Sequence, residues 1–217
     1  NISGYYKLMT RNQNYERNWS VYYKKTYNRP PRLTAKFALK CFNTEYCKKN
    51  NTKRFFVIDL GCGGGRDAFE FLKNGWKVLA IDSEIEAIKF LQNREDRPPE
   101  ADLTFQIAKF KEVDWQECDL VNSSFALPLM PQNDFCGVWQ NIKKNLKTGG
   151  RISCQLFGYK DEWSGRPGMT FHDRASIFFL LKGFQIEMFL EEEIDSETVL
   201  GKRKFWHLFH LVARKMY

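Results

Sequence analysis

The feature that most constrains the fold is an apolar run that leads directly into a glycine-rich turn. Residues 55–60 (FFVIDL) have the composition of a buried β-strand, and residues 61–66 (GCGGGR) follow without a break. A helical spacing of apolar residues then runs from Ala68 to Leu72. Glycines adopt positive φ angles and have no Cβ, so a ligand can lie against the main chain and the helix N-terminus. Strand, glycine turn and helix together predict a binding site for an adenosine derivative.

The glycine spacing separates two candidate ligands. A dinucleotide-binding turn has the pattern G-x-G-x-x-G, whereas here Arg66 takes the place of the last glycine and the pattern from Asp59 is D-x-G-x-G-x-G. Asp82 ends the next apolar strand, residues 78–81, where ribose hydroxyls need an acceptor. These residues resemble the first two motifs of the class I S-adenosylmethionine-dependent methyltransferases. The resemblance implies that Asp59 and the glycines lie near the methionine end of the cofactor, and that Asp82 binds the ribose.

From residue 54 onward, strand and helix patterns alternate, which predicts a parallel sheet with right-handed crossovers. Together with the resemblance, this predicts an α/β, three-layer, doubly wound fold with a seven-stranded, mostly parallel sheet, an antiparallel last strand and an N-terminal helical extension. Residues 184–190 and 204–213 are the predicted last two strands, joined by an acidic loop at 191–197. We expect one domain over residues 1–217, with a basic helical extension or lid at 1–50, a cofactor-binding half at 54–157, and a substrate loop, last helix and edge strands at 158–217.

The resemblance also covers the ends of the third and fourth strands. Lys109 stands where this family often has an acidic residue for the adenine amine, so adenine recognition would fall to backbone groups and to stacking on Phe110. Phe125 follows the fourth strand, where the transferred methyl group usually lies. The residues expected to hold S-adenosylmethionine, with S-adenosylhomocysteine as the product, are Asp59, Gly61, Cys62, Gly63, Gly65, Arg66, Asp82, Ser83, Lys109, Phe110, Asn122, Ser123 and Phe125.

The acceptor is less constrained than the cofactor. Amino-methylating DNA enzymes of the wider family place Pro-Pro and an aromatic residue after the fourth strand, but residues 122–125 (NSSF) contain no proline, which disfavours a nucleic-acid acceptor. The aromatic extension and the long connection 158–171 are the expected covers of the site. The candidate lid and substrate residues are Trp19, Tyr22, Tyr23, Arg32, Trp163, Met169 and Phe171.

An already anionic acceptor needs no general base, whereas a neutral hydroxyl or amine needs a titratable group within reach. His172 and His207 are the candidate bases, because His210 lies deeper in a strand whose pattern indicates packing. Arg166 could hold an oxyanion with its planar guanidinium group. The six cysteines form no C-x-x-C pair, so we expect reduced thiols and no metal site.

Residues 1–54 hold thirteen basic and two acidic residues, a charge that could attract an anionic substrate, nucleic acid or an acidic partner. No apolar run approaches 18 residues, which predicts no membrane span, and reduced cysteines are typical of the cytoplasmic protein that we expect. Residues 19–23 (WSVYY), 171–172 (FH) and 204–207 (KFWH), together with the glycine turn, resemble the tellurite-resistance type of methyltransferase and its small-molecule relatives. The preferred interpretation is therefore methyl transfer to a small molecule that is anionic or a chalcogen compound. The alternatives are a nucleic-acid or protein methyltransferase that uses the basic N-terminus, and a non-catalytic cofactor-binding effector or sensor. The sequence leaves monomer and weak dimer open.

Overall fold

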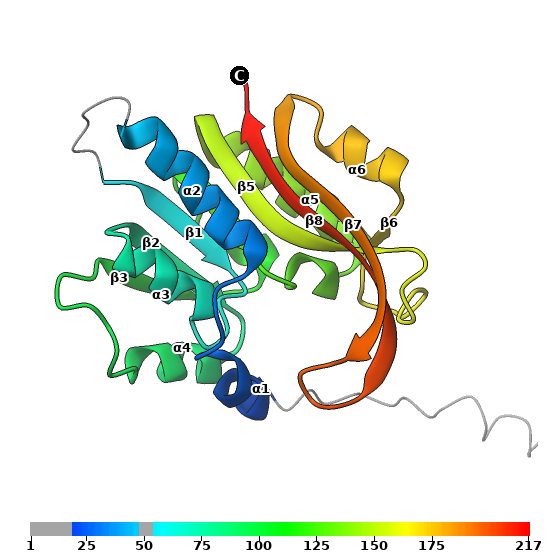
Figure 1. Cartoon of the computed structure of the whole chain (residues 1–217), viewed down its shortest axis with the longest axis horizontal. Helices are drawn as coiled ribbons and strands as arrows, with labels where there is room; N and C mark the ends of the chain where they lie inside the picture. The colour runs from blue at the N-terminus through cyan, green and yellow to red at the C-terminus, as the bar shows by residue number, and fades with distance from the viewer. Residues whose placement is uncertain (1–18, 48–53) are drawn as a thin grey trace, which may run out of the picture.

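The computed structural model describes residues 19–47 and 54–217. Within them, one sheet has the strand order β3-β2-β1-β4-β5-β8-β7, and a short β6 pairs with β5 (Figure 1). Neighbours among β1 to β5 are parallel, whereas β8 is antiparallel to both β5 and β7. This confirms the predicted α/β fold and its antiparallel last strand. The strands are β1 (Phe56–Leu60), β2 (Lys77–Asp82), β3 (Leu103–Ile107), β4 (Cys118–Ser123), β5 (Leu146–Gly158), β6 (Phe171–His172), β7 (Phe184–Glu197) and β8 (Arg203–Lys215).

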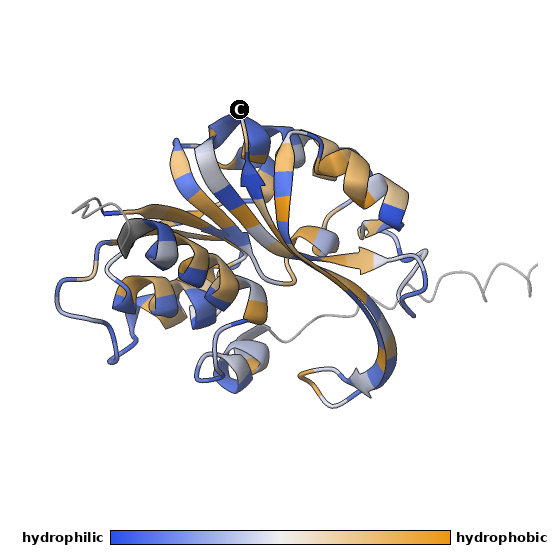
Figure 2. Cartoon of the chain, turned by 45° about the horizontal axis from the view of Figure 1, so that its top comes forward, coloured by the Kyte–Doolittle hydropathy of each residue, from blue (hydrophilic) through white to orange (hydrophobic). Residues whose placement is uncertain are grey.

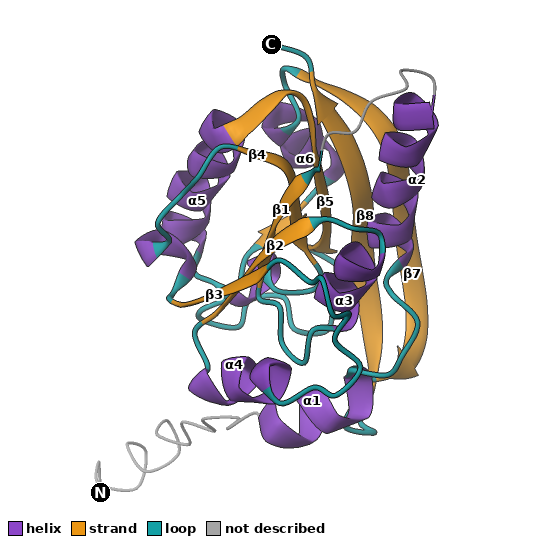
Figure 3. Ribbon diagram, turned by 90° about the vertical axis from the view of Figure 1, so that its left-hand side faces the viewer, coloured by secondary structure: helices purple, strands orange, loops and turns teal. Residues whose placement is uncertain are grey.

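Helices cover both faces of the sheet (Figure 3). One core contains Phe135 and Trp139 of α5 with Ile177 of α6, and the other contains Phe42 of α2 with Phe71 of α3. Orange, marking hydrophobic residues, runs along the strands between these helices (Figure 2). The helices are α1 (Trp19–Thr26), α2 (Leu33–Cys47), α3 (Arg66–Lys73), α4 (Ile85–Gln92), α5 (Gln132–Asn145) and α6 (Arg174–Leu180). None of the helices described has the length and apolar character needed to cross a membrane.

The N-terminal extension divides into two parts with different positions. Helix α1 lies at the carboxyl edge of the parallel strands, as the resemblance implied, whereas α2 packs along the sheet against β5 and β8 (Figures 1 and 3). The remainder of the predicted extension, residues 1–18 and 48–50, lies outside the described residues. In the described part of the extension, α1 and the segment that follows it as far as Arg32 are therefore placed to cover a site at the strand ends.

The prediction of an acidic loop at residues 191–197 is wrong. Strand β7 continues through this segment to Glu197, and the turn is residues 198–202, where Gly201 has a φ of +89°. Pairing with β8, from Glu191 opposite Phe209 to Glu197 opposite Arg203, satisfies backbone groups that a loop would leave to water. Glutamates are tolerated there because β7 is the edge strand. The resulting long hairpin curves toward α1 (Figure 1).

Arg151 of β5 joins three elements through ion pairs, although its side chain is only 1% exposed. Its Nε lies 2.7 Å from Oε2 of Glu187 in β7, and its Nη2 lies 2.6 Å from Oε1 of Glu45 in α2. We expect Arg151→Met to lower the free energy of unfolding by about 3 kcal/mol, the lower end for breaking a buried ion pair, because Glu187 loses its partner. Urea denaturation measures this change.

The control is Lys89→Met, which removes the exposed pair of Lys89 with Glu86 at 3.4 Å. Exposed pairs contribute about 1 kcal/mol or less, so this variant should retain nearly the wild-type stability. Equal losses in the two variants would contradict the role given to Arg151.

Candidate functional site

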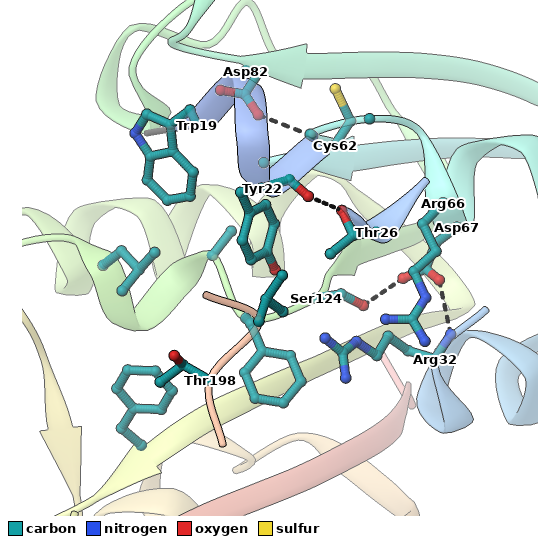
Figure 4. Close-up of a pocket in the computed structure, with 18 of the residues that line it drawn as sticks. Trp19, Tyr22, Thr26, Arg32, Cys62, Arg66, Asp67, Asp82, Ser124 and Thr198 are labelled. Carbon is teal, nitrogen blue, oxygen red and sulfur yellow. Dashed lines mark hydrogen bonds between the residues drawn. The ribbon is translucent and has the colours of Figure 1, made fainter. Parts of the chain in front are cut away.

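A cavity of about 730 Å³ opens at the carboxyl ends of β1, β2 and β4. This volume lies within the range of roughly 300–1,000 Å³ typical of small-molecule sites. The glycine turn forms one end, and α1 and the end of the β7–β8 hairpin, residues 196–200, lie across from the sheet. Figure 4 shows labelled residues from all these segments converging on one space. The cavity is therefore built from parts that are far apart in the sequence.

Backbone conformation in the glycine turn excludes larger residues. Gly61 and Gly63 have φ angles of +72° and +51°, which L-residues rarely adopt. A Cβ atom on Gly61 would lie 2.2 Å from Cβ of Ala126, and one on Gly63 would lie 3.3 Å from the ring of Tyr23. The N–H groups of Gly61 and Cys62 both donate to the carbonyl oxygen of Ile81. The turn is held against β2 and presents bare backbone to the cavity.

Two buried carboxyl groups lie beside this turn. Asp59 is 2% exposed, and burial raises its pKa to about 8, with a further increase from the charge of Asp67. Asp82 accepts hydrogen bonds of 3.0 Å from the N–H groups of Gly63 and Glu84, and burial raises its pKa. Neither carboxyl group forms an ion pair with another described residue. This end of the cavity fits a ligand that carries hydroxyl groups and a positive charge, and that charge would favour the ionised form of Asp59.

Asn122 and Ser123 of β4 hold the end of β1 in place through hydrogen bonds. Asn122 donates a hydrogen bond of 2.7 Å to Oδ1 of Asp59 and accepts one of 2.7 Å from Oγ of Ser153. Ser123 donates to the carbonyl oxygen of Leu60 at 3.0 Å. Both β4 side chains are fully buried and do not line the cavity, so they fix neighbouring strand ends.

The opposite end of the cavity is aromatic, with Phe125, Phe157, Trp163 and Trp206 among its lining residues. Phe125 has a φ of +58°, a strained angle for a residue with a side chain. Its N–H donates to Oε1 of Gln155 at 3.2 Å, and Cζ of Arg32 lies 4.3 Å from its ring centroid. These contacts offset the strain and fix the ring.

A buried ion pair packs against Trp163 and Trp206. Lys204 donates a hydrogen bond to Oδ1 of Asp161, and both side chains are fully buried. The ammonium group of Lys204 lies 4.1 Å from the ring centroid of Trp163 and 3.7 Å from that of Trp206. The long connection is thereby fixed to β8, which places Trp163 beside Trp206.

Helix α1 covers the glycine turn. Tyr23 is 3% exposed and packs on Gly63 and Gly64, and burial raises the pKa of its hydroxyl group. Trp19 stacks on Tyr23 with ring centroids 6.0 Å apart. The structure brings most of the predicted residues together around the cavity. Those that line it are Trp19, Tyr22, Tyr23, Arg32, Asp59, Gly61, Cys62, Gly63, Arg66, Asp82, Ser83, Lys109, Phe110, Phe125 and Trp163.

Other predicted residues lie outside the cavity lining. Gly65 packs against Leu91 and Phe69, and Phe171 and Met169 belong to the cluster behind Trp163. The sequence did not indicate the contribution of residues 196–200, because no local pattern specifies where a hairpin end folds.

The structure does not bring the predicted reactive groups to the cavity lining. His172 is buried beside Phe135, where burial lowers its pKa to about 4. Arg166 lies over the ring of Trp163, with Cζ 5.2 Å from the ring centroid. His207 packs against Gly158, accepts a hydrogen bond from the N–H of Lys160, and contacts Glu191 at 2.9 Å.

The interpretation of His210 as a packed residue needs correction, because His210 lines the cavity. Side chains alternate along a strand, so Trp206, Leu208 and His210 share the cavity face of β8 while His207 faces away. The alternation of side chains along a strand, counted from Trp206, is the sequence signal that could have indicated that His210 shares the cavity face.

Comparisons with known proteins agree with this architecture. A family model described as a methyltransferase domain matches residues 51–175, more than half of the chain. TehB from Haemophilus influenzae has a TM-score of 0.65 and 16% identity, over 78% of this chain and 65% of that one. A search of curated protein sequences finds no match.

Two further solved structures match over longer spans. Magnesium protoporphyrin IX methyltransferase (ChlM) from Synechocystis PCC 6803, with bound SAH, has a TM-score of 0.64 and 14% identity, over 91% of this chain and 94% of that one. The 1,6-didemethyltoxoflavin-N1-methyltransferase from Burkholderia thailandensis has a TM-score of 0.61 and 16% identity, over 100% of this chain and 85% of that one. At these identities the likenesses show the fold, and the chain spans less than two thirds of TehB.

The raised pKa of Asp59 predicts a pH dependence of stability. Its folded pKa of about 8 exceeds the ordinary value, so the folded state binds the proton more tightly. The stabilisation is complete below the ordinary pKa and is lost as pH rises from about 4 through 8. We expect the free energy of unfolding to fall less steeply over this interval in Asp59→Asn, as measured by urea denaturation at several pH values.

Asp102→Asn is the matched control, because this carboxylate is 38% exposed and lies at the opposite end of the strands. Its slope should match that of the wild type. A wild-type slope in Asp59→Asn would mean that Asp59 is ionised in the folded protein.

Proposed function

The chain belongs to the methyltransferase domain family, and on that premise we propose that it transfers a methyl group from S-adenosylmethionine to a small-molecule acceptor. The observation that carries the proposal is one cavity that joins an acidic, glycine-lined end to an aromatic end. The neighbours ChlM and the toxoflavin methyltransferase, whose structures hold S-adenosylhomocysteine, support the choice of cofactor. Both are named for small-molecule substrates, which supports the choice of acceptor class.

The residues at the acidic end fit the cofactor. Each oxygen of Asp82 accepts one backbone hydrogen bond, which leaves lone pairs for ribose hydroxyls. Asp59 and the backbone of Gly61 would hold the methionine portion, and Phe110 offers a ring surface for adenine. When bound, S-adenosylmethionine supplies a methyl group on a positively charged sulfur.

The arginines between the two ends favour an anionic acceptor. Arg32 and Arg66 line the cavity, and neither forms an ion pair with another described residue. Burial and the charge of Arg32 lower the pKa of Arg66 to about 10, so it remains a cation at neutral pH. The enclosing α1 and hairpin exclude water, and the rings of Phe125 and Trp206 orient the acceptor. Alignment and loss of water then supply most of the acceleration.

Release of S-adenosylhomocysteine across an acceptor panel tests the proposal. The panel contains organic carboxylates, phenols, and tellurite and selenite oxyanions, with DNA, RNA and a protein mixture as separate arms. Release with a small acceptor supports the proposal. Release only with nucleic acid or protein would replace it with the corresponding alternative, and cofactor binding without release in any arm would favour a sensor.

Asp82→Ala should weaken S-adenosylhomocysteine binding by roughly 1.5–3 kcal/mol, the range for a hydrogen bond to a charged group. The reason is the loss of the buried carboxylate in which β2 ends. Isothermal titration calorimetry measures the affinity. Asp102→Ala is the control, because Asp102 is exposed and does not line the cavity, and equal affinities in the two variants would refute the ribose placement.

Gly61→Ala should weaken S-adenosylhomocysteine binding at least tenfold, about 1.4 kcal/mol, because the added Cβ displaces the turn from Ala126. Gly75→Ala separates this effect from backbone strain. Gly75 has a φ of +77°, but a Cβ there would meet nothing within 4 Å. Both variants should lose stability on heating, and only Gly61→Ala should lose affinity. Similar affinities would show that the turn does not approach the ligand.

A further inference from the structure

His210 is fixed by its strand position at the aromatic end of the cavity. It lies opposite Gln155 in the β5–β8 pairing and shares the cavity face of β8 with Trp206 and Leu208. Its side chain is 13% exposed, so it is enclosed without being sealed from a ligand. Of the three histidines in the chain, His210 is the one that lines the cavity. Glu192, on the cavity face of β7, contacts it.

Glu192 orients the His210 ring. Nε2 of His210 lies 3.1 Å from Oε2 of Glu192, and an ionised carboxylate can only accept at this contact. The pair therefore selects the tautomer with the proton on Nε2, which leaves a lone pair on Nδ1. No described residue forms a hydrogen bond with Nδ1 of His210. A histidine with one nitrogen held by a carboxylate and the other nitrogen free has the arrangement of a proton acceptor.

The surroundings of His210 match a flat, electron-rich ligand. The ring of Phe125 is edge-on to His210, with centroids 6.4 Å apart, and Trp206 is edge-on to Phe125 at 6.2 Å. Arg32 lies over the Phe125 ring with Cζ 4.3 Å from the centroid. An aromatic acceptor placed among these rings would have a proton acceptor and a guanidinium group near one edge.

Burial favours the neutral form of His210. Burial lowers the pKa of His210 from its ordinary value, and the positive charge of Arg32 lowers it further, whereas Glu192 on β7 acts in the opposite direction. Gln155, its partner on β5, carries no charge. The imidazole is therefore available as a base at neutral pH, and Arg32 stabilises an anion formed beside it.

We propose that His210, oriented by Glu192, is the general base for an aromatic acceptor that carries a phenol-type hydroxyl group. This inference rests on the proposed function and specifies its acceptor. The hydroxyl proton moves to Nδ1 of His210, and the oxygen lone pair forms the bond to the methyl carbon. The bonding pair between methyl carbon and sulfur leaves with the sulfur, so the positive charge of the sulfonium donor ends as a protonated imidazole.

A binding measurement tests proton transfer without turnover. The probe is 4-nitrophenol added to the protein loaded with S-adenosylhomocysteine, and the signal is the absorption of nitrophenolate in mildly acidic buffer. Binding to the wild type should increase this absorption, whereas His210→Gln should bind the probe without the increase. Glu192→Gln should give a smaller increase, because it removes the carboxylate that stabilises the protonated ring. Equal signals in wild type and His210→Gln, or no signal in the wild type, would overturn the proposal.

Kinetics with a series of phenols of graded acidity provide the second arm. His210→Gln should lower kcat/KM for weakly acidic phenols by about 100-fold or more, within the range of general base catalysis, and should affect strongly acidic phenols much less. Its S-adenosylhomocysteine affinity should equal that of the wild type. His207→Gln is the matched control, because His207 lies on the opposite face of β8 and should retain the wild-type pattern.

The outcomes separate the two proposals. If the wild type binds cofactor and methylates only acceptors without an ionisable hydroxyl group, the role of His210 is refuted and the methyl transfer stands. A uniform loss across the phenol series in His210→Gln would also refute it, since that pattern indicates packing. Failure of the wild type to bind S-adenosylhomocysteine would remove both proposals.

Discussion

The cavity depends on a chain of buried hydrogen bonds that runs from Ser153 through Asn122 to Asp59. These three residues lie in register on β5, β4 and β1, and Asn122 is fully buried. A buried amide or carboxyl group without a partner is costly, so each residue requires the next one. The ends of three adjacent strands are thereby aligned. The glycine turn directly follows β1, and Phe125 follows β4. The alignment of the strand ends therefore sets the distance between the turn and Phe125.

The same edge of the sheet also holds the N-terminal extension. The N–H of Arg32 and the hydroxyl group of Ser124 both donate to Asp67, at 2.8 and 2.5 Å. Gln155 joins Thr34 of α2 to the N–H of Phe125. The segment between α1 and α2 is therefore bonded to the strand ends, and α1 is positioned over the glycine turn by these contacts. The hydrogen bonds that align the strand ends therefore also hold the segment that carries α1.

Local signals predicted the parts of the site that one segment can specify. The glycine spacing after Asp59 and the acid at the end of β2 placed one end of the cavity, and the alternation of elements placed the sheet. These signals failed where contacts with distant segments determine the local structure. Residues 191–197 suggested an acidic loop, but pairing with β8 makes them strand. His207 and His210 point to opposite faces of β8, and the sequence alone does not show which face borders the cavity.

The distribution of charge in the cavity suits a reaction that removes charge. Carboxyl groups of Asp59 and Asp82 lie at one end, and the guanidinium groups of Arg32 and Arg66 lie between that end and the aromatic one. Fixed charges placed against the reacting atoms would stabilise a sulfonium and an anionic acceptor more than the less charged transition state. Arg32 lies over one face of Phe125, and the rings of Phe157, Trp163 and Trp206 line this end of the cavity and exclude water. The charged groups can therefore select and orient the reactants, while the aromatic rings exclude water from the step between them.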